Sequence, residues 1–483
     1  MAVAGGSTVS DQTEAAQPHW SSRFAFVMAA IGSAVGLGNL WRFPAEAGAN
    51  GGGAFVVFYI FCVVLIGLPL LLSETLIGRH GGSSAVESAK TVARDSGVST
   101  GWSALAGVGV LGAFFILSFY SVVAGWVLYY VGVFAGDLVG ALGGNLAGGA
   151  FAGQDQAAIE ALLPALFADP VMLVSLHALF MAVTLFFVAR GVSSGIEVVA
   201  VWLMPTFFAL FLGITVYGAF TGAFAEAVDF LFAFNPERLL HPDVMLSALG
   251  QAFFSLSLGS ALMITYGAYA GRDTNLAQSS LIIGGADTAV AILAGLCIFP
   301  IVFAAGLDAA AGPALMFVSL PVAFQAMPFG SLIGLLFFLM VGFAALTSSV
   351  ALLEAPSSWL MHRFRVSRGR AAILVAGAAF VAGIFSALGY NLLADVRPLA
   401  WWPSFARLDI LDSIDTVTGK ILLPLSGLLT AIFIGWIADR RLIDAENGLS
   451  GGTQLLWRFL VAWLCPIVLT AILVLGIFPG LIG

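Results

Sequence analysis

Long apolar stretches alternate with short polar connections along almost the whole chain. A helix needs about 20 apolar residues to cross the hydrocarbon core of a bilayer, and eleven stretches are long enough. The pattern therefore predicts an all-α integral membrane protein with about eleven transmembrane helices. These helices are expected near residues 24–47, 53–78, 103–136, 170–189, 195–220, 244–270, 276–306, 327–360, 371–390, 412–437 and 456–481.

Composition and charge agree with a protein embedded in lipid. Hydrophobic residues make up 60% of the chain and charged residues 9%, which leaves too little polar surface for a water-soluble domain. Most Lys and Arg residues lie beside alternate connections, whereas the opposite connections hold only Arg238, Arg397 and Arg407. This bias predicts a cytoplasmic N-terminus and, with an odd number of helices, an extracellular or periplasmic C-terminus. Residues 1–19 are polar and are expected to form a cytoplasmic tail.

The sequence favours neither an enzyme nor a nucleic-acid-binding protein. Its three cysteines and five histidines are dispersed without the spacing of metal ligands. No paired catalytic acids and no nucleotide-binding motif occur along the chain. The expected partners are therefore the lipid bilayer and a small solute.

The first predicted helix contains a stretch that ordinary transmembrane helices avoid. Residues 29–44 read AAIGSAVGLGNLWRFP, with Gly32, Gly36 and Gly38 followed by Asn39 and Arg42. Each glycine weakens a helix by about 1 kcal/mol relative to alanine. A single glycine would indicate close helix packing. The cluster, together with the polar residues, predicts an unwound segment, which must lie inside protein or line a hydrated cavity.

Two further predicted helices also contain polar segments. Residues 250–269, GQAFFSLSLGSALMITYGAY, interrupt the sixth helix, five helices after the first break. Broken helices at corresponding places in consecutive halves indicate an inverted-repeat transporter with its site near the bilayer midplane. The third segment, residues 344–356, contains Thr347, Ser348 and Ser349. These hydroxyls could bond back to their own helix or, opposite a glycine break, join backbone carbonyls in a sodium site.

Four separated motifs carry a resemblance to a known family. They are WSSRFAFVMAAIGSAVGLGNLWRFP, NGGGAFVVFYIFCVVLIGLPLLLSETLIGR, GQAFFSLSLG and LTSS. From Trp20 to about Trp436 the chain resembles the neurotransmitter:sodium symporter family. The resemblance implies a leucine-transporter fold with a 5+5 inverted repeat and broken first and sixth helices. It places the first repeat (helices 1–5) at residues 20–220, the second (helices 6–10, with outer loops) at 221–437, and a loop with the eleventh helix at 438–483.

The same resemblance implies two sodium sites. The first would use the Ala34 carbonyl, the Asn39 side chain, Ser255 and Asp287 of the seventh helix. The alternative for Asp287 is a helix-end residue in a cytosolic loop. The second site would be formed by Gly32, Val35, Ala344, Thr347 and Ser348.

Positions of this chain that match the family's motifs also imply a substrate site and an outer gate. The unwound backbone of the first helix would receive the substrate's carboxylate, Tyr120 would donate its hydroxyl to it, and Phe254 would close the pocket. Arg42 and Asp415 match the outer gate pair, and Glu74 matches an acid that supports the broken backbone. The implied substrate residues are Ala34, Gly36, Gly38, Ile116, Tyr120, Phe254, Ser255, Ser257, Ser260, Ser348 and Leu352.

One position bears on the class of substrate. Monoamine carriers of the family have an aspartate where this chain has Gly36, so the resemblance implies an amino acid that brings its own carboxylate. Ser260 stands where the leucine-selective pattern has a phenylalanine, while Ile116 and Leu352 keep the pocket apolar. A large apolar or aromatic amino acid is therefore expected. The hydroxyls of Ser257 and Ser260 leave a smaller or more polar one as the alternative.

The chloride site of the family is matched only in part. Tyr59, Gln251 and Ser255 correspond to chloride ligands, but Ala291 stands where the family has a serine. Asp287 supplies a carboxylate nearby, which could replace the anion. Chloride is therefore not expected to be required.

The inner gate also departs from the family's pattern. Its basic residue aligns to Gln17 and its acidic partner aligns near His362. Inner closure is therefore expected to rely on Trp20 and Arg23. Two further charges within the predicted helices, which could bond to each other or to backbone, are Glu354 and Lys420.

Together these expectations describe a sodium-coupled secondary active symporter that imports an amino acid by alternating access. Two sodium ions, an amino acid and the bilayer are its expected partners. A prokaryotic cell (inner) membrane is the expected location, and the expected oligomeric state is a monomer or a weak homodimer. The alternatives are a sodium- or proton-coupled carrier of another small amine or osmolyte, and a non-transporting amino-acid sensor.

Overall fold

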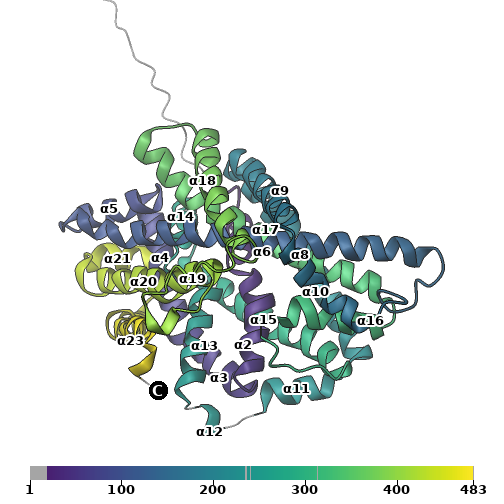
Figure 1. The fold of residues 1–483 in the computed structure, drawn as a ribbon. Helices are drawn as coiled ribbons and strands as arrows, with labels where there is room; N and C mark the ends of the chain where they lie inside the picture. The colour runs from purple at the N-terminus through teal and green to yellow at the C-terminus, as the bar shows by residue number, and fades with distance from the viewer. Residues whose placement is uncertain (1–18, 234–235, 240, 313, 482–483) are drawn as a thin grey trace, which may run out of the picture.

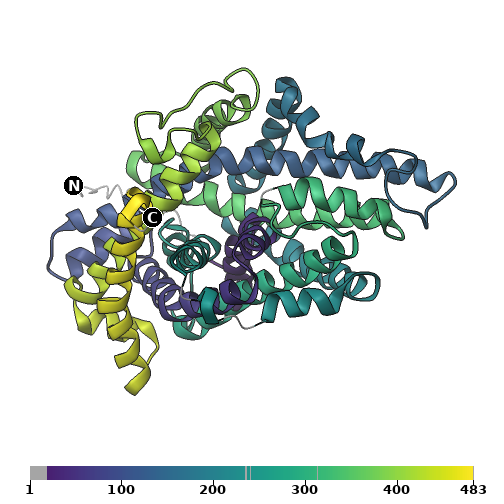
Figure 2. The same cartoon turned by 60° about the horizontal axis from the view of Figure 1, so that its bottom comes forward.

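A computed structural model describes residues 19–233, 236–239, 241–312 and 314–481, and this part of the chain is helical without β-strands. The helices form a single bundle (Figure 1). In Figure 2 the N-terminal helices, in purple, lie in the interior of the bundle beside helices from the middle of the chain, in teal. Gln17 and almost all of the predicted cytoplasmic tail lie outside the described residues.

The helices of the first half are α1 Arg23–Ala34, α2 Phe43–Ala49, α3 Gly53–Cys62, α4 Leu68–Gly81, α5 Ala85–Asp95, α6 Ala104–Leu142, α7 Gln156–Glu160, α8 Leu162–Ala168, α9 Pro170–Ala189 and α10 Glu197–Thr221. Those of the second half are α11 Phe224–Phe232, α12 Pro236–Leu239, α13 Pro242–Ser255, α14 Leu262–Ala268, α15 Leu276–Ala304, α16 Leu320–Ala326, α17 Gly330–Phe364, α18 Arg368–Leu388, α19 Ile410–Val417, α20 Leu423–Ile432, α21 Arg440–Asn447, α22 Gly451–Phe459 and α23 Cys465–Ile477.

The membrane spans agree with the eleven expected from the apolar pattern. Nine helical segments of the described chain are long and apolar enough to cross a bilayer, and α1 with α2 forms a tenth span that bends by 47°. The remaining predicted span is divided between α13 and α14, which residues 256–261 separate. The predicted fold, with its broken first and sixth helices, is thereby confirmed. The boundaries of its two repeats stay predictions.

The first break follows from the local sequence. α1 begins at an N-cap, because the Ser22 hydroxyl accepts a hydrogen bond from the Ala25 N–H, and it ends at Ala34 before an extended Val35. The chain resumes as a π-helical turn, Gly38–Arg42, which leads into α2. Pro44 lies in the first turn of α2, directly after this π-helical turn.

The second break is held in an unusual backbone conformation. Ser257, Gly259 and Ala261 all have positive φ, at 53°, 74° and 61°, which is strained for residues other than glycine. The Gly259 N–H donates to the Glu74 carboxylate over 2.7 Å. A Cβ at Gly259 would lie 2.1 Å from the Leu423 carbonyl oxygen, so α20 approaches the break closely. Glu74 on α4 therefore supports the broken backbone.

Small residues let helices approach one another around these breaks. α4 lies against α14, and a Cβ added at Gly78 would lie 1.9 Å from the Ile264 carbonyl oxygen. α6 and α17 pack along one another, with the Tyr130 and Phe338 rings stacked at 4.8 Å between centroids. Close backbone approach of this kind is how helices associate in lipid, where burial of apolar surface gives little driving force.

Replacing Gly78 with alanine is expected to lower thermal stability, because the new methyl group would collide with the Ile264 carbonyl. Overpacking typically costs about 1–3 kcal/mol, which corresponds to a midpoint lower by a few degrees. Gly107→Ala is the control, since a Cβ there meets open space. Unfolding followed by tryptophan fluorescence in detergent would give both midpoints, and equal midpoints would contradict the close contact.

Candidate functional site

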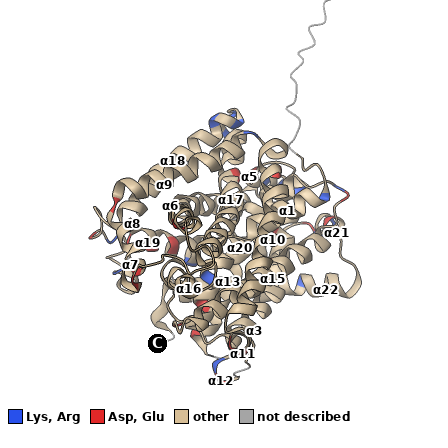
Figure 3. Cartoon of the chain, turned by 90° about the vertical axis from the view of Figure 1, so that its right-hand side faces the viewer, with Lys and Arg blue, Asp and Glu red and all other residues tan. Residues whose placement is uncertain are grey.

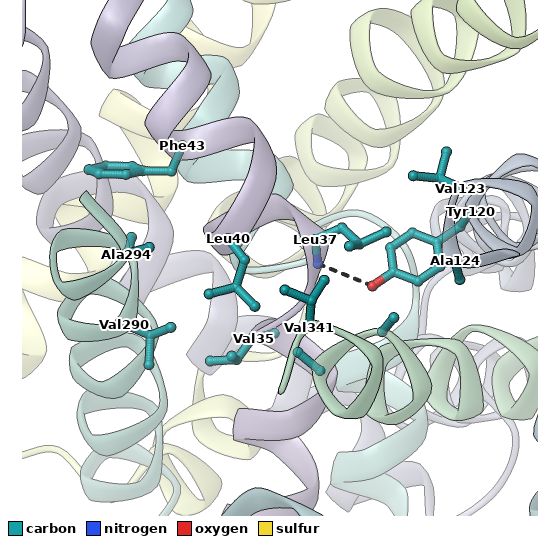
Figure 4. Close-up of a cluster of buried hydrophobic side chains, with 14 of the residues drawn as sticks. Val35, Leu37, Leu40, Phe43, Tyr120, Val123, Ala124, Val290, Ala294 and Val341 are labelled. Atoms are coloured by element: carbon teal, nitrogen blue, oxygen red, sulfur yellow. Dashed lines mark hydrogen bonds between the residues drawn. The ribbon is translucent and has the colours of Figure 1, made fainter. Parts of the chain in front are cut away.

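The unwound segment between α1 and α2 turns its backbone groups toward side chains of other helices. The Leu37 N–H donates to the Tyr120 hydroxyl over 3.2 Å (Figure 4), and the Gly36 N–H donates to the Asn39 Oδ1 over 3.2 Å. A Cβ at Gly36 would lie 2.5 Å from the Ser348 Oγ and 2.8 Å from the Tyr120 hydroxyl oxygen. Gly36 is therefore a point of close contact between the first break, α6 and α17.

A small cavity lies between the two broken helices. Its volume is about 30 Å³, which is room for one or two water molecules, so a larger ligand requires its walls to move. Ten of the eleven predicted substrate residues line it, and Ser255 does not. Its lining is Ser33, Ala34, Gly36, Leu37, Gly38, Ile116, Tyr120, Phe254, Ser257, Ser260, Ser348, Leu352 and Leu423.

Three of these lining residues were not predicted. Ser33 and Leu37 belong to the same glycine-rich stretch as the predicted residues, so the first break itself was the signal for them. The Ser33 hydroxyl is buried and has no hydrogen-bond partner within the described protein. Leu423 comes from α20, and nothing in the local sequence marks it.

Asp287 lies at the centre of a polar cluster beside the cavity. It is fully buried inside α15, which rules out the alternative of a helix-end residue in a loop. The Asn39 Nδ2 donates to its Oδ1 over 2.7 Å, and the Ser255 hydroxyl donates to its Oδ2 over 2.6 Å. The Tyr59 hydroxyl lies 3.3 Å from the same Oδ2. Three of the four residues predicted for the first sodium site, Asn39, Ser255 and Asp287, are thus in contact. Ser255 faces Asp287 rather than the cavity.

The electrostatics of this cluster suit a bound cation. The ion pairs of the described residues leave Asp287 without a cationic partner, although a buried carboxylate is costly unless its charge is compensated. The Ser255 Oγ, the Asp287 Oδ1 and the Asp287 carbonyl converge on the Asn39 Nδ2 at 2.9, 2.7 and 3.2 Å. If the Asn39 amide turned over, its Oδ1 would join these oxygens in place of the Nδ2. A set of hard oxygen ligands without sulfur or imidazole fits an alkali cation.

A second oxygen cluster lies on the other side of the same unwound segment. The Ser348 hydroxyl lies 3.2 Å from both the Gly32 and the Val35 carbonyl oxygens. The Thr347 hydroxyl lies 3.0 Å from the Ala344 carbonyl oxygen. Gly32, Val35 and Ser348 therefore bring oxygens together at one junction of α1 with α17. The Thr347 and Ser349 hydroxyls instead bond back to carbonyls of their own helix, and the role of Thr347 and Ala344 in a sodium site stays a prediction.

The side of the cavity that is predicted to face outward, here called the outer side, is covered by Phe254. Its ring separates the small cavity from an outer one of about 310 Å³ that also reaches Arg42 and Asp415. The Arg42 guanidinium lies 4.6 Å from the centre of the Phe254 ring, and its Nε lies 3.8 Å from the Glu46 Oε1. Arg42 and Asp415 thus face one cavity without an ion pair between them in this conformation. Their role as a gate pair stays a prediction.

The side that is predicted to face the cytoplasm, here called the inner side, is closed by the segment before the first helix. The Trp20 indole N–H donates to the Tyr266 carbonyl, and the Trp20 backbone N–H donates to the Tyr269 carbonyl, each over 3.1 Å. The Ser21 N–H donates to the Glu197 carboxylate over 3.0 Å and its hydroxyl donates to the same group, which ties this segment to α10. Arg23, the other residue expected there, is exposed.

A buried ion pair reinforces the inner side, and the sequence did not reveal its partners. Arg368 of α18 donates to both Glu354 oxygens, at 2.7 and 3.0 Å, and the Tyr269 hydroxyl donates to Glu354 over 2.6 Å. The suggested bond between Glu354 and Lys420 is absent, since Lys420 lies over the Phe405 ring at 4.9 Å. The pair joins α17 to α18, and Tyr269, directly after α14, bonds to the same carboxylate.

Two broken helices around a closed cavity, with an oxygen cluster on each side, define a membrane transporter of the broken-helix class. Comparison with known sequences identifies the family within this class. The chain belongs to the Sodium:neurotransmitter symporter family, which it matches over residues 17–138 and 169–479. It is accordingly a sodium-dependent transporter with many membrane spans, and not an enzyme.

Individual relatives extend over nearly the whole chain. The uncharacterized sodium-dependent transporter YhdH of Bacillus subtilis is 35% identical, over 96% of this chain and 97% of its own length. An uncharacterized sodium-dependent transporter of Haemophilus influenzae is 31% identical, over 95% of this chain and 98% of its own length. The crystal structure of MhsT in complex with L-phenylalanine has a TM-score of 0.84 and 38% identity, covering 95% of this chain and 99% of that one.

Replacing Glu197 with alanine is expected to loosen the inner closure, because both contacts of Ser21 with α10 are lost. At about 1 kcal/mol per hydrogen bond, the two bonds contribute about 2 kcal/mol, so opening should become about thirtyfold more frequent. The probe is a cysteine at Ser33 in the cavity, because the native residues Cys62, Cys297 and Cys465 are buried.

The rate at which a thiol reagent labels Ser33→Cys would be compared with and without Glu197→Ala. Glu226→Ala, which removes an exposed acid away from Ser21, is the matched control. Equal labelling rates in all three proteins would contradict a latch between Ser21 and Glu197.

Proposed function

We propose that the protein is a sodium-coupled symporter that imports an amino acid by alternating access. The observation that carries this proposal is the position of both oxygen clusters on one stretch of chain around the first break, residues 32–39, which also forms a wall of the cavity. Ions and substrate would contact the same few residues. Each ligand would then raise the affinity for the others by the same factor.

The roles of the site residues belong to this proposal. The Ala34 carbonyl, Asn39, Ser255 and Asp287 bind the first sodium ion, and the substrate's carboxylate completes that site. The backbone at Gly36 and Gly38 receives the carboxylate, to which Tyr120 donates its hydroxyl. The second sodium ion is bound by Gly32, Val35, Ala344, Thr347 and Ser348.

The substrate is proposed to be a large apolar or aromatic amino acid. MhsT, which is similar over nearly the full length, binds L-phenylalanine in its crystal structure. Ile116, Leu352 and Leu423 give the cavity of this chain apolar walls, and Ser260 occupies little of it. The orphaned Ser33 hydroxyl is the feature that favours the alternative of a more polar amino acid.

The proposed cycle moves from an outward-open state to the closed state and then inward. Sodium and substrate bind from the outer cavity, Phe254 closes over them, and release follows when Trp20 leaves Tyr266 and Tyr269. Two sodium ions crossing a tenfold gradient and a 100 mV potential release about 7 kcal/mol, enough for about five decades of accumulation if coupling is tight. We place the N-terminus in the cytoplasm of a prokaryotic cell, and expect a monomer or a weak homodimer.

Transport is proposed to be independent of chloride. The hydroxyls of Ser255 and Tyr59, which would face a chloride ion, are turned toward the Asp287 carboxylate. A fixed anion there repels a second anion and offers the sodium ion the same negative charge.

Uptake into proteoliposomes tests the function. A panel of labelled amino acids would be offered under inward gradients of sodium, potassium or choline. Sodium-driven accumulation of one class of amino acid is the expected result. Saturable binding without accumulation would indicate a sensor, and sodium-driven uptake of an amine that amino acids do not inhibit would indicate another substrate class.

Replacing Asp287 with asparagine keeps the size of the side chain and removes its charge. The sodium concentration for half-maximal uptake should rise by about tenfold or more, since contact with a full charge exceeds 1.4 kcal/mol in a low-dielectric site. Chloride should then restore part of the loss. Sodium titrations in chloride and in gluconate measure both effects, with Asp308→Asn as a control on the exposed surface. A variant that responds to both ions like the parent would overturn the role of Asp287.

Replacing Ser260 with phenylalanine should fill the part of the cavity next to Leu423. Overpacking of about 1–3 kcal/mol predicts that uptake of phenylalanine falls at least tenfold relative to uptake of alanine. Ser260→Ala, which removes the hydroxyl without filling space, should leave this ratio unchanged. If Ser260→Ala alone abolishes uptake, the hydroxyl binds a polar substrate and the apolar assignment fails.

A further inference from the structure

A large crevice lies outside the transport site, between α5, α6, α17 and α18. Its volume is about 800 Å³, and its walls are mostly apolar, with Val110, Phe114, Leu360 and Val375 among them. It shares no lining residue with the cavity between the broken helices. The crevice is therefore distinct from the proposed transport site.

The crevice opens toward lipid. Leu111 and Leu374 line it and have exposed fractions of 46% and 59%. Both residues lie within membrane spans, Thr100–Leu142 and Arg368–Leu388. Surface exposed at that depth meets hydrocarbon chains rather than water.

Two basic side chains stand at one end of the crevice. They are Lys90 of α5 and Arg363 in the last turn of α17. The Lys90 Nζ lies 2.6 Å from the Glu87 Oε1, whereas Arg363 has no acidic partner among the described residues and lies 5.7 Å from the Phe364 ring. Two cations and one anion leave this end positive. Figure 3 shows more Lys and Arg at the top of the molecule, where α17 leads into α18.

We propose that the crevice binds one anionic phospholipid from the leaflet on this basic side of the protein. The apolar walls would take its acyl chains, and Lys90 and Arg363 would bind its phosphate. Basic pockets between transmembrane helices on the cytoplasmic side recognise anionic headgroups in this way, and a guanidinium matches the geometry of a phosphate. A zwitterionic lipid would bring its own cation against these two side chains.

The bound lipid would lie close to the inner ion pair. Pro356 and Leu360 line the crevice within two turns of Glu354, whose carboxylate is held by Arg368. A lipid packed against both α17 and α18 would stabilise their contact at that point. This lipid site is separate from the proposed transport site, and lipid binding there does not depend on which substrate is transported.

The crevice offers two independent variants. Gly107→Trp would fill it, because a Cβ at Gly107 meets open space in the structure, and Gly107→Ala is its control. Lys90→Gln with Arg363→Gln would remove the two cations. The matched control is Arg94→Gln with Arg370→Gln, since both of those arginines are exposed and neither lines the crevice.

Native mass spectrometry of the delipidated full-length protein, titrated with phosphatidylglycerol or phosphatidylcholine, would count the lipids bound. The protein should bind one phosphatidylglycerol saturably and phosphatidylcholine about tenfold more weakly. The double charge variant should lose about tenfold or more in affinity, Gly107→Trp should lose the bound lipid, and both controls should behave like the parent.

Inorganic phosphate is the third ligand to be tested, because it shares the headgroup's chemistry without the chains. Displacement of the lipid by millimolar phosphate would show a simple anion site and overturn the proposal. Equal affinity for both lipids, or a double charge variant that binds like the parent, would overturn it as well. If Gly107→Trp does not fold, the charge variant and its control still decide the question.

Discussion

Every backbone N–H or C=O that leaves a helix inside the bilayer must find a partner within the protein, because hydrocarbon offers none. The two breaks release such groups, and side chains from other helices receive them: Tyr120 accepts from Leu37, and Glu74 accepts from Gly259. Ser348 meets the carbonyls at the end of α1. The groups that satisfy the broken backbone thus also line or adjoin the cavity, so folding and binding depend on the same contacts.

The two sides of the cavity are closed by different kinds of interaction. The outer side is covered by one aromatic ring, Phe254, with the Arg42 guanidinium over it, and no hydrogen bond of the Phe254 side chain holds it there. The inner side is held by hydrogen bonds of Trp20 and Ser21 and by the pair of Glu354 with Arg368. Opening inward requires several polar contacts to break together, which makes the outer side the easier one to open from this state.

The sequence predicted what depends on local patterns. Runs of about 20 apolar residues predicted the spans, and clusters of glycine with polar residues predicted both breaks. Most of the cavity lining was predicted only through the resemblance to the family. It did not predict contacts that depend on how distant helices rotate against one another. Arg368 with Glu354, Ser21 with Glu197, and Leu423 in the cavity are of this kind. The prediction that Ser255 lines the cavity was wrong. A side chain next to a helix break can face the cavity or the neighbouring helix, and Ser255 faces Asp287 of α15.

The fixed carboxylate of Asp287 has a consequence for the membrane voltage. On the proposed cycle a loaded carrier moves two positive ions together with this one negative charge, so it carries a net single positive charge inward. If the carboxylate stays ionised, the empty carrier returns with its negative charge alone. An inside-negative potential, worth about 2.3 kcal/mol per charge at 100 mV, then drives both half-cycles rather than the loaded step alone.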